Sequence, residues 1–199
     1  MLNQKKRGKI LGMNFNSFKD KIFYILEASE SLVVSILVLL TIYVLIAFPV
    51  EVSGSSMSPN FETGDRLLIE RLTKYVEGYQ IGDTVVLHPP QADFIDYIKR
   101  IVALPNDTVK IFNCRVEIFR NGAKYELDEK VYLPDGVCTV GGRAVLDGRP
   151  YTLKENEYMV LGDNRNNSQD SRAFGFVTQD RIQGKVVARF WPFDKVKLY

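Results

Sequence analysis

Hydrophobic residues follow two different patterns along this chain, one before and one after residue 50. Residues 32–50 read LVVSILVLLTIYVLIAFPV and include no charged side chain. A helix of this length measures about 28 Å at ~1.5 Å per residue, close to the ~30 Å hydrocarbon core of a bilayer. A buried helix of a soluble domain shows a polar face, and a cleaved leader has a shorter apolar run ending in small residues. We therefore predict that residues 32–50 form a retained transmembrane anchor.

The segment before the apolar run, residues 1–31, is basic. It contains Lys5, Lys6, Arg7, Lys9, Lys19 and Lys21, whereas Arg66 is the only basic residue between positions 51 and 70. The positive-inside rule therefore predicts a cytoplasmic N-terminus and places residues 51–199 on the other side of the membrane. Phe15, Phe18, Ile22 and Ile25 recur at spacings of three and four, which indicates either an interfacial helix or a helical extension of the anchor.

After residue 50 the apolar residues occur in short alternating runs that are typical of β-strands. These runs are residues 66–72, 83–87, 97–104, 108–111, 115–119, 158–161 and 185–191. Asn121-Gly122 separates residues 115–119 from 123–127 and indicates a two-residue hairpin turn. We therefore predict a mainly β, antiparallel domain. The Gly- and Pro-rich stretch near residues 133–150 indicates an insertion rather than a core element.

Composition limits the classes of function and the kinds of site that this chain can have. The net charge of +2 argues against a nucleic-acid-binding protein, which carries a strong basic excess on one face. His88, Cys114 and Cys138 are the only histidine and cysteines, and they have no metal-ligand spacing. We therefore expect neither a metal site nor a cofactor. A disulfide between Cys114 and Cys138 is compatible with an extracytoplasmic domain, but it depends on a Cα separation that the sequence does not define.

Three polar segments stand out from the strand pattern. The first, Ser53-Gly54-Ser55-Ser56-Met57-Ser58-Pro59, follows the apolar run, and by itself it is typical of a hydrogen-bonded turn. The third, residues 162–172, reads GDNRNNSQDSR, which indicates either a solvated loop or an ion-paired loop that shapes a site.

Lys99 lies in the second segment, in the predicted strand 97–104. Side chains alternate along a strand, so Lys99 shares a face with Tyr97, Ile101 and Ala103. Burial disfavours the ammonium form and lowers a lysine pKa, and a neutral amine is a competent general base. Arg100 points to the opposite face and stays charged, so it cannot take this role. His88 is the only histidine available to a Ser-His-Asp arrangement, and no acidic partner is indicated near it in the sequence.

The three segments, in this order after an N-terminal apolar segment, resemble the type I signal peptidase family. Ser56-Met57-Ser58-Pro59 resembles its Ser-Met-x-Pro box, and Tyr97-Ile98-Lys99-Arg100 followed by Leu104-Pro105-Asn106-Asp107 resembles its lysine box. Residues 162–172 resemble its C-terminal box, with Asn166 where many members have Asp. The resemblance covers residues 32–192.

The resemblance implies a role for each matching residue. Ser56 would be the nucleophile, with Ser55 a weaker candidate, and Lys99 would be the general base. Ser168 would hydrogen-bond the lysine amine, and Asp170 and Arg172 would form a supporting salt bridge, with Asp163 fixing the same loop. The Ser56 N–H would meet the oxyanion, while Gly54 stands where some members have a serine that provides a second donor.

The resemblance also implies a fold and a substrate. The fold would be a β-rich peptidase core with a smaller inserted subdomain within residues 105–151. The substrates would be exported preproteins cut after small residues of the Ala-x-Ala kind, and the anchor in membrane lipid would hold the site near the membrane surface. The expected location is a membrane, with the bacterial plasma membrane favoured.

Two other classes of function are weighed against this interpretation. A non-catalytic, membrane-anchored β-domain that binds partners would keep the anchor and the strands, but it would not need Lys99 on an apolar face. A sortase-like cysteine transpeptidase would use Cys114 or Cys138, but a reactive thiolate needs basic neighbours, and His88 has no matching context.

Overall fold

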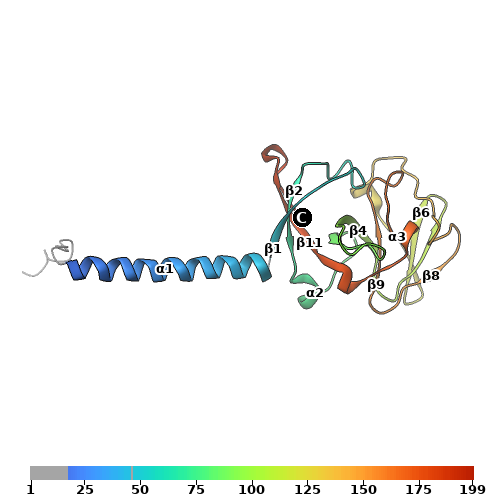
Figure 1. Ribbon diagram of the computed structural model, residues 1–199. Coiled ribbons are helices and arrows are strands. Elements are labelled where there is room, and N and C mark those ends of the chain that lie inside the picture. The colour runs from blue at the N-terminus through green and yellow to red at the C-terminus, as the bar shows by residue number, and fades with distance from the viewer. Residues whose placement is uncertain (1–17, 46) are drawn as a thin grey trace, which may run out of the picture. The chain divides into compact units, whose positions relative to one another are not determined.

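The computed structural model describes residues 18–45 and 47–199 (Figure 1). Helix α1, Phe18–Leu45, is drawn in blue, and it joins the predicted interfacial residues Ile22 and Ile25 to the apolar run in one continuous helix. Phe15 lies outside the described residues. Among the described residues, one helical stretch, Lys21–Tyr43, is long and apolar enough to cross a membrane, with a mean hydropathy of 2.0.

The predicted end of the helix at residue 50 is wrong, because Ala47–Glu51 forms strand β1. β1 pairs antiparallel with β2, from Ala47 opposite Glu70 to Glu51 opposite Arg66. Pro49 cannot donate a helical hydrogen bond, and its ring disfavours the helical conformation of the residue before it. Phe48 and Val50 pack against the core of the domain, so tertiary packing favours a strand where the sequence shows only an apolar run.

The chain from Leu45 to Tyr199 forms one compact domain that is built mainly from antiparallel strands. The larger sheet has the order β1-β2-β11-β3-β4-β9-β10, and β12 pairs with β11. Its strands after β1 are β2 Arg66–Glu70, β3 Thr84–Leu87, β4 Tyr97–Ala103, β9 Glu157–Leu161, β10 Val177–Thr178, β11 Ile182–Trp191 and β12 Lys197–Leu198. The prediction of a mainly antiparallel β-domain is confirmed.

A second, smaller sheet has the order β7-β6-β5-β8 and falls within residues 108–152. Its strands are β5 Thr108–Phe112, β6 Arg115–Arg120, β7 Ala123–Glu126 and β8 Tyr151–Thr152. Asn121 and Gly122 both have positive φ, 51° and 78°, so they make the hairpin turn that the sequence predicted. In Figure 1, β6 and β8 lie on the side of the domain away from β2.

Short helical turns connect the strands. They are α2 Thr73–Val76, α3 Ser171–Phe174, and the 3-10 turns η1 Glu129–Val131, η2 Gln179–Arg181 and η3 Phe193–Lys195. Both η1 and the turn around Cys138 lie between β7 and β8, in the region predicted as an insertion. Cys114 and Cys138 form a disulfide, which ties the β5–β6 turn to this region.

Three clusters of buried apolar side chains hold the domain together. One joins the two sheets, with Val102 and Leu161 of the larger sheet packed with Ile111 and Ile118 of the smaller one. A second lies on the larger sheet around Leu87 and Ile101. The third contains Met57 and Phe61 from the loop after β1, together with Leu67, Ile69 and Val186. The third cluster therefore fixes the serine-rich loop to the sheet.

Candidate active site

The serine-rich loop between β1 and β2 positions Ser56. Met57 and Phe61, on its C-terminal side, are fully buried, and the Phe61 N–H donates to the Met57 carbonyl at 3.0 Å. The Asn164 N–H donates to the Ser56 carbonyl at 3.0 Å, which connects this loop to the C-terminal segment. Ser56 is therefore held by the buried side chains of Met57 and Phe61, which follow it in the loop, and by the main-chain hydrogen bond from Asn164.

Lys99 reaches Ser56 from strand β4. Its Nζ donates to Ser56 Oγ at 2.8 Å and to the Ile98 carbonyl at 2.8 Å, and it lies 4.9 Å from the centre of the Tyr97 ring. The side chain is only 2% exposed. The structure thus places the predicted base next to the predicted nucleophile, although 43 residues separate them in the sequence.

Burial changes the protonation of Lys99. Removal of the ammonium group from water lowers the pKa of Lys99 from 10.5 to about 8, while the negative charges of Asp170 and Asp163 act in the opposite direction. A neutral amine is then accessible near neutral pH, and it accepts a proton from a hydroxyl at this distance. In that state the hydrogen bond between the two groups runs from Ser56 Oγ to Lys99 Nζ.

Asp170 and Arg172 form the predicted salt bridge. Arg172 Nε and Nη2 donate to the two carboxylate oxygens of Asp170, each at 2.8 Å. Asp170 also accepts the Gly162 N–H at 3.0 Å and the Arg172 N–H at 3.2 Å, so it caps α3. Burial acts to raise the pKa of Asp170, but the hydrogen bond and charge of Arg172, together with hydrogen bonds from the Gly162 N–H and the Ser168 hydroxyl, outweigh it and hold the pKa below its usual value. Asp170 is therefore held as a carboxylate.

Ser168 does not make the expected hydrogen bond to Lys99. Its hydroxyl is enclosed and acts on Asp170, where it helps to lower the pKa of that carboxyl, while the lysine amine donates to Ser56 and Ile98. Ser168 lies against Gly162, where an added Cβ would meet Ser168 Oγ at 2.2 Å and the Ser56 carbonyl at 2.4 Å. Gly162 thus permits the close approach of the serine-rich loop and the C-terminal segment.

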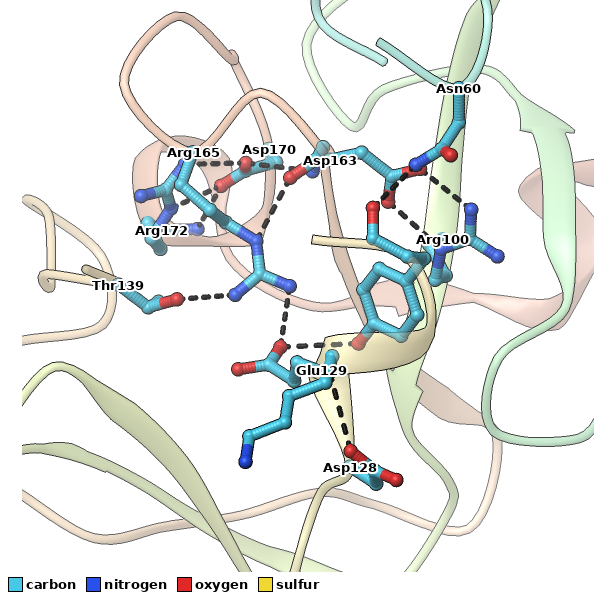
Figure 2. A network of polar contacts seen from close by, with 12 residues as sticks. Asn60, Arg100, Asp128, Glu129, Thr139, Asp163, Arg165, Asp170 and Arg172 are labelled. Carbon is cyan, nitrogen blue, oxygen red and sulfur yellow. Dashed lines mark hydrogen bonds and ion pairs between the residues drawn. The ribbon is translucent and has the colours of Figure 1, made fainter. Parts of the chain in front are cut away.

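Asp163 binds Arg100 rather than another residue of its own loop (Figure 2). Arg100 Nε and Nη2 donate to the two carboxylate oxygens at 2.8 and 2.6 Å, and Asn60 Nδ2 donates to Asp163 at 2.9 Å. The contact joins β4, the C-terminal segment and the serine-rich loop. From the sequence, Arg100 was not expected to act as a base, and its contact with Asp163 was not predicted.

Arg165 extends this network toward the insertion (Figure 2). Its guanidinium donates to the Gly162 carbonyl at 3.0 Å, to Glu129 at 2.5 Å and to Thr139. Glu129 and Thr139 were not predicted as site residues. Arg165 itself was noted as one charge of an ion-paired loop, but nothing in the local sequence identifies its partners.

Gly54 and Ser55 lie at the edge of the site. Gly54 has a φ of +97°, which a side chain rarely adopts, and its N–H and carbonyl both bond Thr63 Oγ1 at 3.1 Å. Ser55 Oγ accepts from Asn167 Nδ2 at 2.9 Å, so its hydroxyl is engaged away from Lys99. Ser56 rather than Ser55 is the serine that meets the lysine.

A groove of about 650 Å³ runs beside Ser56 and Lys99. It is lined by residues 50–56 and 95–99, together with Leu67, Val86, Asn167 and Gln169. Among the described strands, β1 is the end strand of its sheet, and β9 pairs with β4 only from Arg100 to Ala103. Within the described chain, β1 and the start of β4 therefore each have an edge without a partner strand, where an extended peptide can add as a further strand.

His88 is not part of the Ser56–Lys99 pair. Its ring lies 3.3 Å from Asp96 and 2.9 Å from the side-chain nitrogen of Gln183, and within the described residues it has no hydrogen bond to a serine. No group of three or more His, Cys, Asp or Glu side chains suited to a metal ion occurs in the described part of the chain.

The chain matches the family described as "Signal peptidase, peptidase S26" over residues 25–191. It is 34% identical over 181 residues to signal peptidase IB of Staphylococcus aureus (strain COL), an alignment that covers 87% of this chain and 93% of that protein. It is 33% identical over 178 residues to the probable signal peptidase I-2 of Synechocystis sp., covering 87% of this chain and 76% of that protein.

A crystal structure of a signal peptidase I from Enterococcus faecalis V583 is also similar, at 28% identity with a TM-score of 0.42, over 55% of this chain and 97% of that one. The family match spans most of the chain, and the identity to S. aureus signal peptidase IB extends over nearly all of it. This chain therefore belongs to the signal peptidase family, peptidase S26, and is a serine peptidase.

Proposed function

We propose that this protein removes signal peptides from exported preproteins with Ser56 as the nucleophile and Lys99 as the general base. The observation that carries the proposal is the 2.8 Å contact between Lys99 Nζ and Ser56 Oγ, made by a lysine that is 2% exposed. Burial lowers the pKa of Lys99 to about 8, so a useful fraction of the amine is neutral under physiological conditions.

The reaction proceeds in two steps. Neutral Lys99 takes the proton of Ser56 as Oγ attacks the scissile carbonyl carbon, and the carbonyl oxygen becomes an oxyanion. The Lys99 ammonium then donates that proton to the leaving amine as the peptide C–N bond breaks and an ester with Ser56 remains. The same amine takes a proton from water, whose oxygen attacks the ester carbon, and Lys99 returns the proton to Ser56 Oγ as the acid product leaves.

The main-chain N–H of Ser56 is the candidate donor to the oxyanion. Within the described residues this N–H has no hydrogen-bond acceptor, whereas the Ser56 carbonyl is already bound by the Asn164 N–H. A preorganised backbone N–H contributes most where charge develops in a site shielded from water. Gly54 offers no hydroxyl as a second donor.

The groove suits an extended peptide with small side chains near the cut. Residues of β1 and of the start of β4 line it, and each strand has an edge without a partner strand in the described chain, so a bound peptide gains main-chain hydrogen bonds that do not depend on its sequence. Specificity then rests on the side-chain space next to Ser56 and Lys99. Family membership supports signal-peptide-bearing preproteins as substrates, and we propose that the cut follows small residues of the Ala-x-Ala kind.

We further propose that α1 anchors the protein in a bacterial plasma membrane with its N-terminus in the cytoplasm. The stretch Lys21–Tyr43 is about 35 Å long at ~1.5 Å per residue, enough for a ~30 Å hydrocarbon core. The basic residues listed for positions 1–31 support the orientation. Retention of the full chain in membranes washed with alkaline carbonate, and protease access to residues 51–199 from the outside only, would test both points.

The deciding experiment for the reaction uses detergent-solubilised protein, a preprotein whose signal ends in Ala-x-Ala, and mass spectrometry of the products. Ser56→Ala and Ser55→Ala are tested beside the unaltered protein. We expect a single cut after Ala-x-Ala that is lost in Ser56→Ala and kept in Ser55→Ala. Equal cleavage by the unaltered protein and Ser56→Ala would contradict the assignment of the nucleophile.

A further inference from the structure

The short turn η1 and Tyr132, which follows it, belong to the insertion, yet together they contact all three polar segments of the site (Figure 2). Glu129 pairs with Arg165 of the C-terminal segment. The Tyr132 carbonyl accepts from Asn60 Nδ2 of the serine-rich loop at 2.6 Å. The Tyr132 ring lies 4.3 Å from the guanidinium of Arg100 in β4. Among the described residues that line the groove, none belongs to this turn, so its contacts reach the site from behind.

Arg165 connects the insertion to the main chain of the site. Its side chain is fully buried, and its Nε donates to the Gly162 carbonyl at 3.0 Å. The Gly162 N–H donates to Asp170 at 3.0 Å, so both main-chain polar groups of this glycine are bound. The Gly162 backbone lies so close to the serine-rich loop that an added Cβ would be 2.4 Å from the Ser56 carbonyl oxygen. A displacement of Arg165 therefore disturbs the backbone that packs against Ser56.

Glu129 holds the guanidinium of Arg165 in place. Its carboxylate accepts from Arg165 Nη2 at 2.5 Å, and within the described residues it is the acidic group that forms an ion pair with Arg165. A buried guanidinium without a countercharge is strongly destabilised, and it moves toward water or toward another acceptor. Loss of the Glu129 charge is therefore expected to draw Arg165 away from the Gly162 carbonyl.

Tyr132 orients the Glu129 carboxylate. Its hydroxyl donates to Glu129 Oε1 at 3.1 Å, and its N–H donates to the Glu129 carbonyl at 3.1 Å. Burial, together with the negative charge of Glu129, raises the pKa of Tyr132, so the hydroxyl keeps its proton and remains a donor. The carboxylate is thus fixed within its own turn before it meets Arg165.

We propose that Glu129 is a positioning residue for the Ser56–Lys99 pair. Through Arg165 it fixes the Gly162 backbone, and with it the C-terminal segment, in the arrangement that brings Lys99 into contact with Ser56. This inference rests on the proposed function and gives the insertion a part in it. Supporting contacts of this kind set the geometry of reacting groups, and a displacement of about 1 Å lowers the rate about 100-fold.

Separate measurement of kcat and KM for a peptide with an Ala-x-Ala cut tests this role. The full chain is used in detergent, at a temperature where circular dichroism shows each variant to be folded. Glu129→Gln should lower kcat about 10- to 100-fold and leave KM within about twofold, because no residue of the groove is altered. Tyr132→Phe keeps the ring and the main chain and should lower kcat about fivefold, which corresponds to loss of one hydrogen bond. It also supplies the test if Glu129→Gln does not fold.

Glu126→Gln is the matched control. It removes another carboxylate of the insertion, whose partner Arg115 is exposed, so neither kcat nor KM should change. An equal fall of kcat in Glu126→Gln would show a general effect of charge in the insertion and would contradict the role of Glu129.

The double variant Glu129→Met/Arg165→Met separates positioning from stability. Apolar replacement of both partners of a buried ion pair restores stability, so its unfolding temperature should exceed that of Glu129→Gln. Its kcat should stay low, because methionine cannot donate to the Gly162 carbonyl. Recovery of kcat together with the unfolding temperature would show that the pair only stabilises the fold, and the positioning role would be wrong.

The remaining outcomes separate this inference from the function on which it rests. An unchanged kcat in both Glu129→Gln and Tyr132→Phe, or a loss confined to KM, would overturn the positioning role while the unaltered protein still cuts the peptide. Failure of the unaltered protein to cut the peptide would overturn the proposed function and the positioning role together.

Discussion

Arg100 binds both carboxylate oxygens of Asp163, at 2.8 and 2.6 Å, from the position in β4 directly after Lys99. Side chains alternate along a strand, so Arg100 and Lys99 project to opposite faces of β4. Lys99 contacts Ser56, and Arg100 holds the C-terminal segment through Asp163. Strand β4, which carries one of the three polar segments, therefore contacts the other two.

The Arg100–Asp163 contact predicts a stability effect. Asp163→Asn leaves Arg100 buried without a countercharge, so we expect the free energy of unfolding to fall by about 3–5 kcal/mol and activity to fall with it. Glu62→Gln is the control, because it breaks the exposed Lys195–Glu62 pair and should cost less than about 1 kcal/mol. Urea unfolding of the two variants measures both values, and similar small losses would show that the Asp163 contact contributes little.

Lys99→Arg should be as inactive as Lys99→Met. A guanidinium stays protonated at working pH and cannot accept the Ser56 proton, and methionine offers no base, so we expect kcat/KM to fall by about 10³-fold in both. Thermal unfolding checks that the variants are folded. Substantial cleavage by a folded Lys99→Arg protein would contradict the role of the lysine as base.

Activity should rise with pH as Lys99 loses its proton. The pKa of Lys99 is lowered to about 8, so kcat/KM should increase tenfold per pH unit below 8 and level off above it. At pH 6 the rate should be about 1% of the plateau, because about that fraction of the amine is neutral. His88→Gln should show the same profile. A limb near pH 6.5 that disappears in His88→Gln would instead identify the histidine as the base.

Gly162→Ala should disrupt the site although it replaces neither proposed catalytic residue. The added Cβ would lie 2.2 Å from Ser168 Oγ and 2.4 Å from the Ser56 carbonyl oxygen, so the serine-rich loop must shift. We expect kcat/KM to fall at least about 100-fold, since small misplacements of reacting groups cost that much.

The double variant Gly162→Ala/Ser168→Gly removes the side-chain clash but keeps the main-chain clash with Ser56. Its kcat/KM should therefore stay low, while Ser168→Gly alone should lower kcat/KM by a smaller factor. Full recovery in the double variant would show that the contact with Ser168, rather than the approach of Gly162 to Ser56, sets the geometry.

Removal of the Cys114–Cys138 disulfide should lower stability more than activity. The bond links residues 24 positions apart, and closing a loop of that size contributes about 3 kcal/mol. Cys114→Ser/Cys138→Ser should show a lower unfolding temperature than the unaltered protein, and their unfolding temperatures should become equal in reductant. An unchanged unfolding temperature in the double variant would show that packing alone holds the insertion.

Much of the secondary structure could be predicted because it follows local periodicity. The alternation in residues 97–104 and the turn residues Asn121-Gly122 each define an element without reference to distant parts of the chain. The end of α1 was mispredicted because an unbroken apolar run continues to residue 50. Pro49 was the local signal for the change, and pairing with β2 makes it a strand.

The partners of the buried charges could not be predicted in the same way. Arg100 finds Asp163, and Arg165 finds Glu129 and Thr139, across separations of 26 to 63 residues. The loops contain several acidic side chains that could pair with Arg100 or Arg165, and the composition does not distinguish among them. The hydrogen bond expected between Ser168 and Lys99 is absent, and the lysine amine donates to the Ile98 carbonyl and to Ser56.

The sequence by itself determined the classes of element, the order of the three polar segments and, through its resemblance, which serine and lysine to examine. Only the tertiary structure decided that Lys99 is buried beside Ser56 and that its pKa is lowered to about 8. The physical reason is that periodicity and turn preference act between neighbouring residues. Desolvation depends instead on which distant segments cover a side chain, and here those segments are the serine-rich loop and the residues that follow β9.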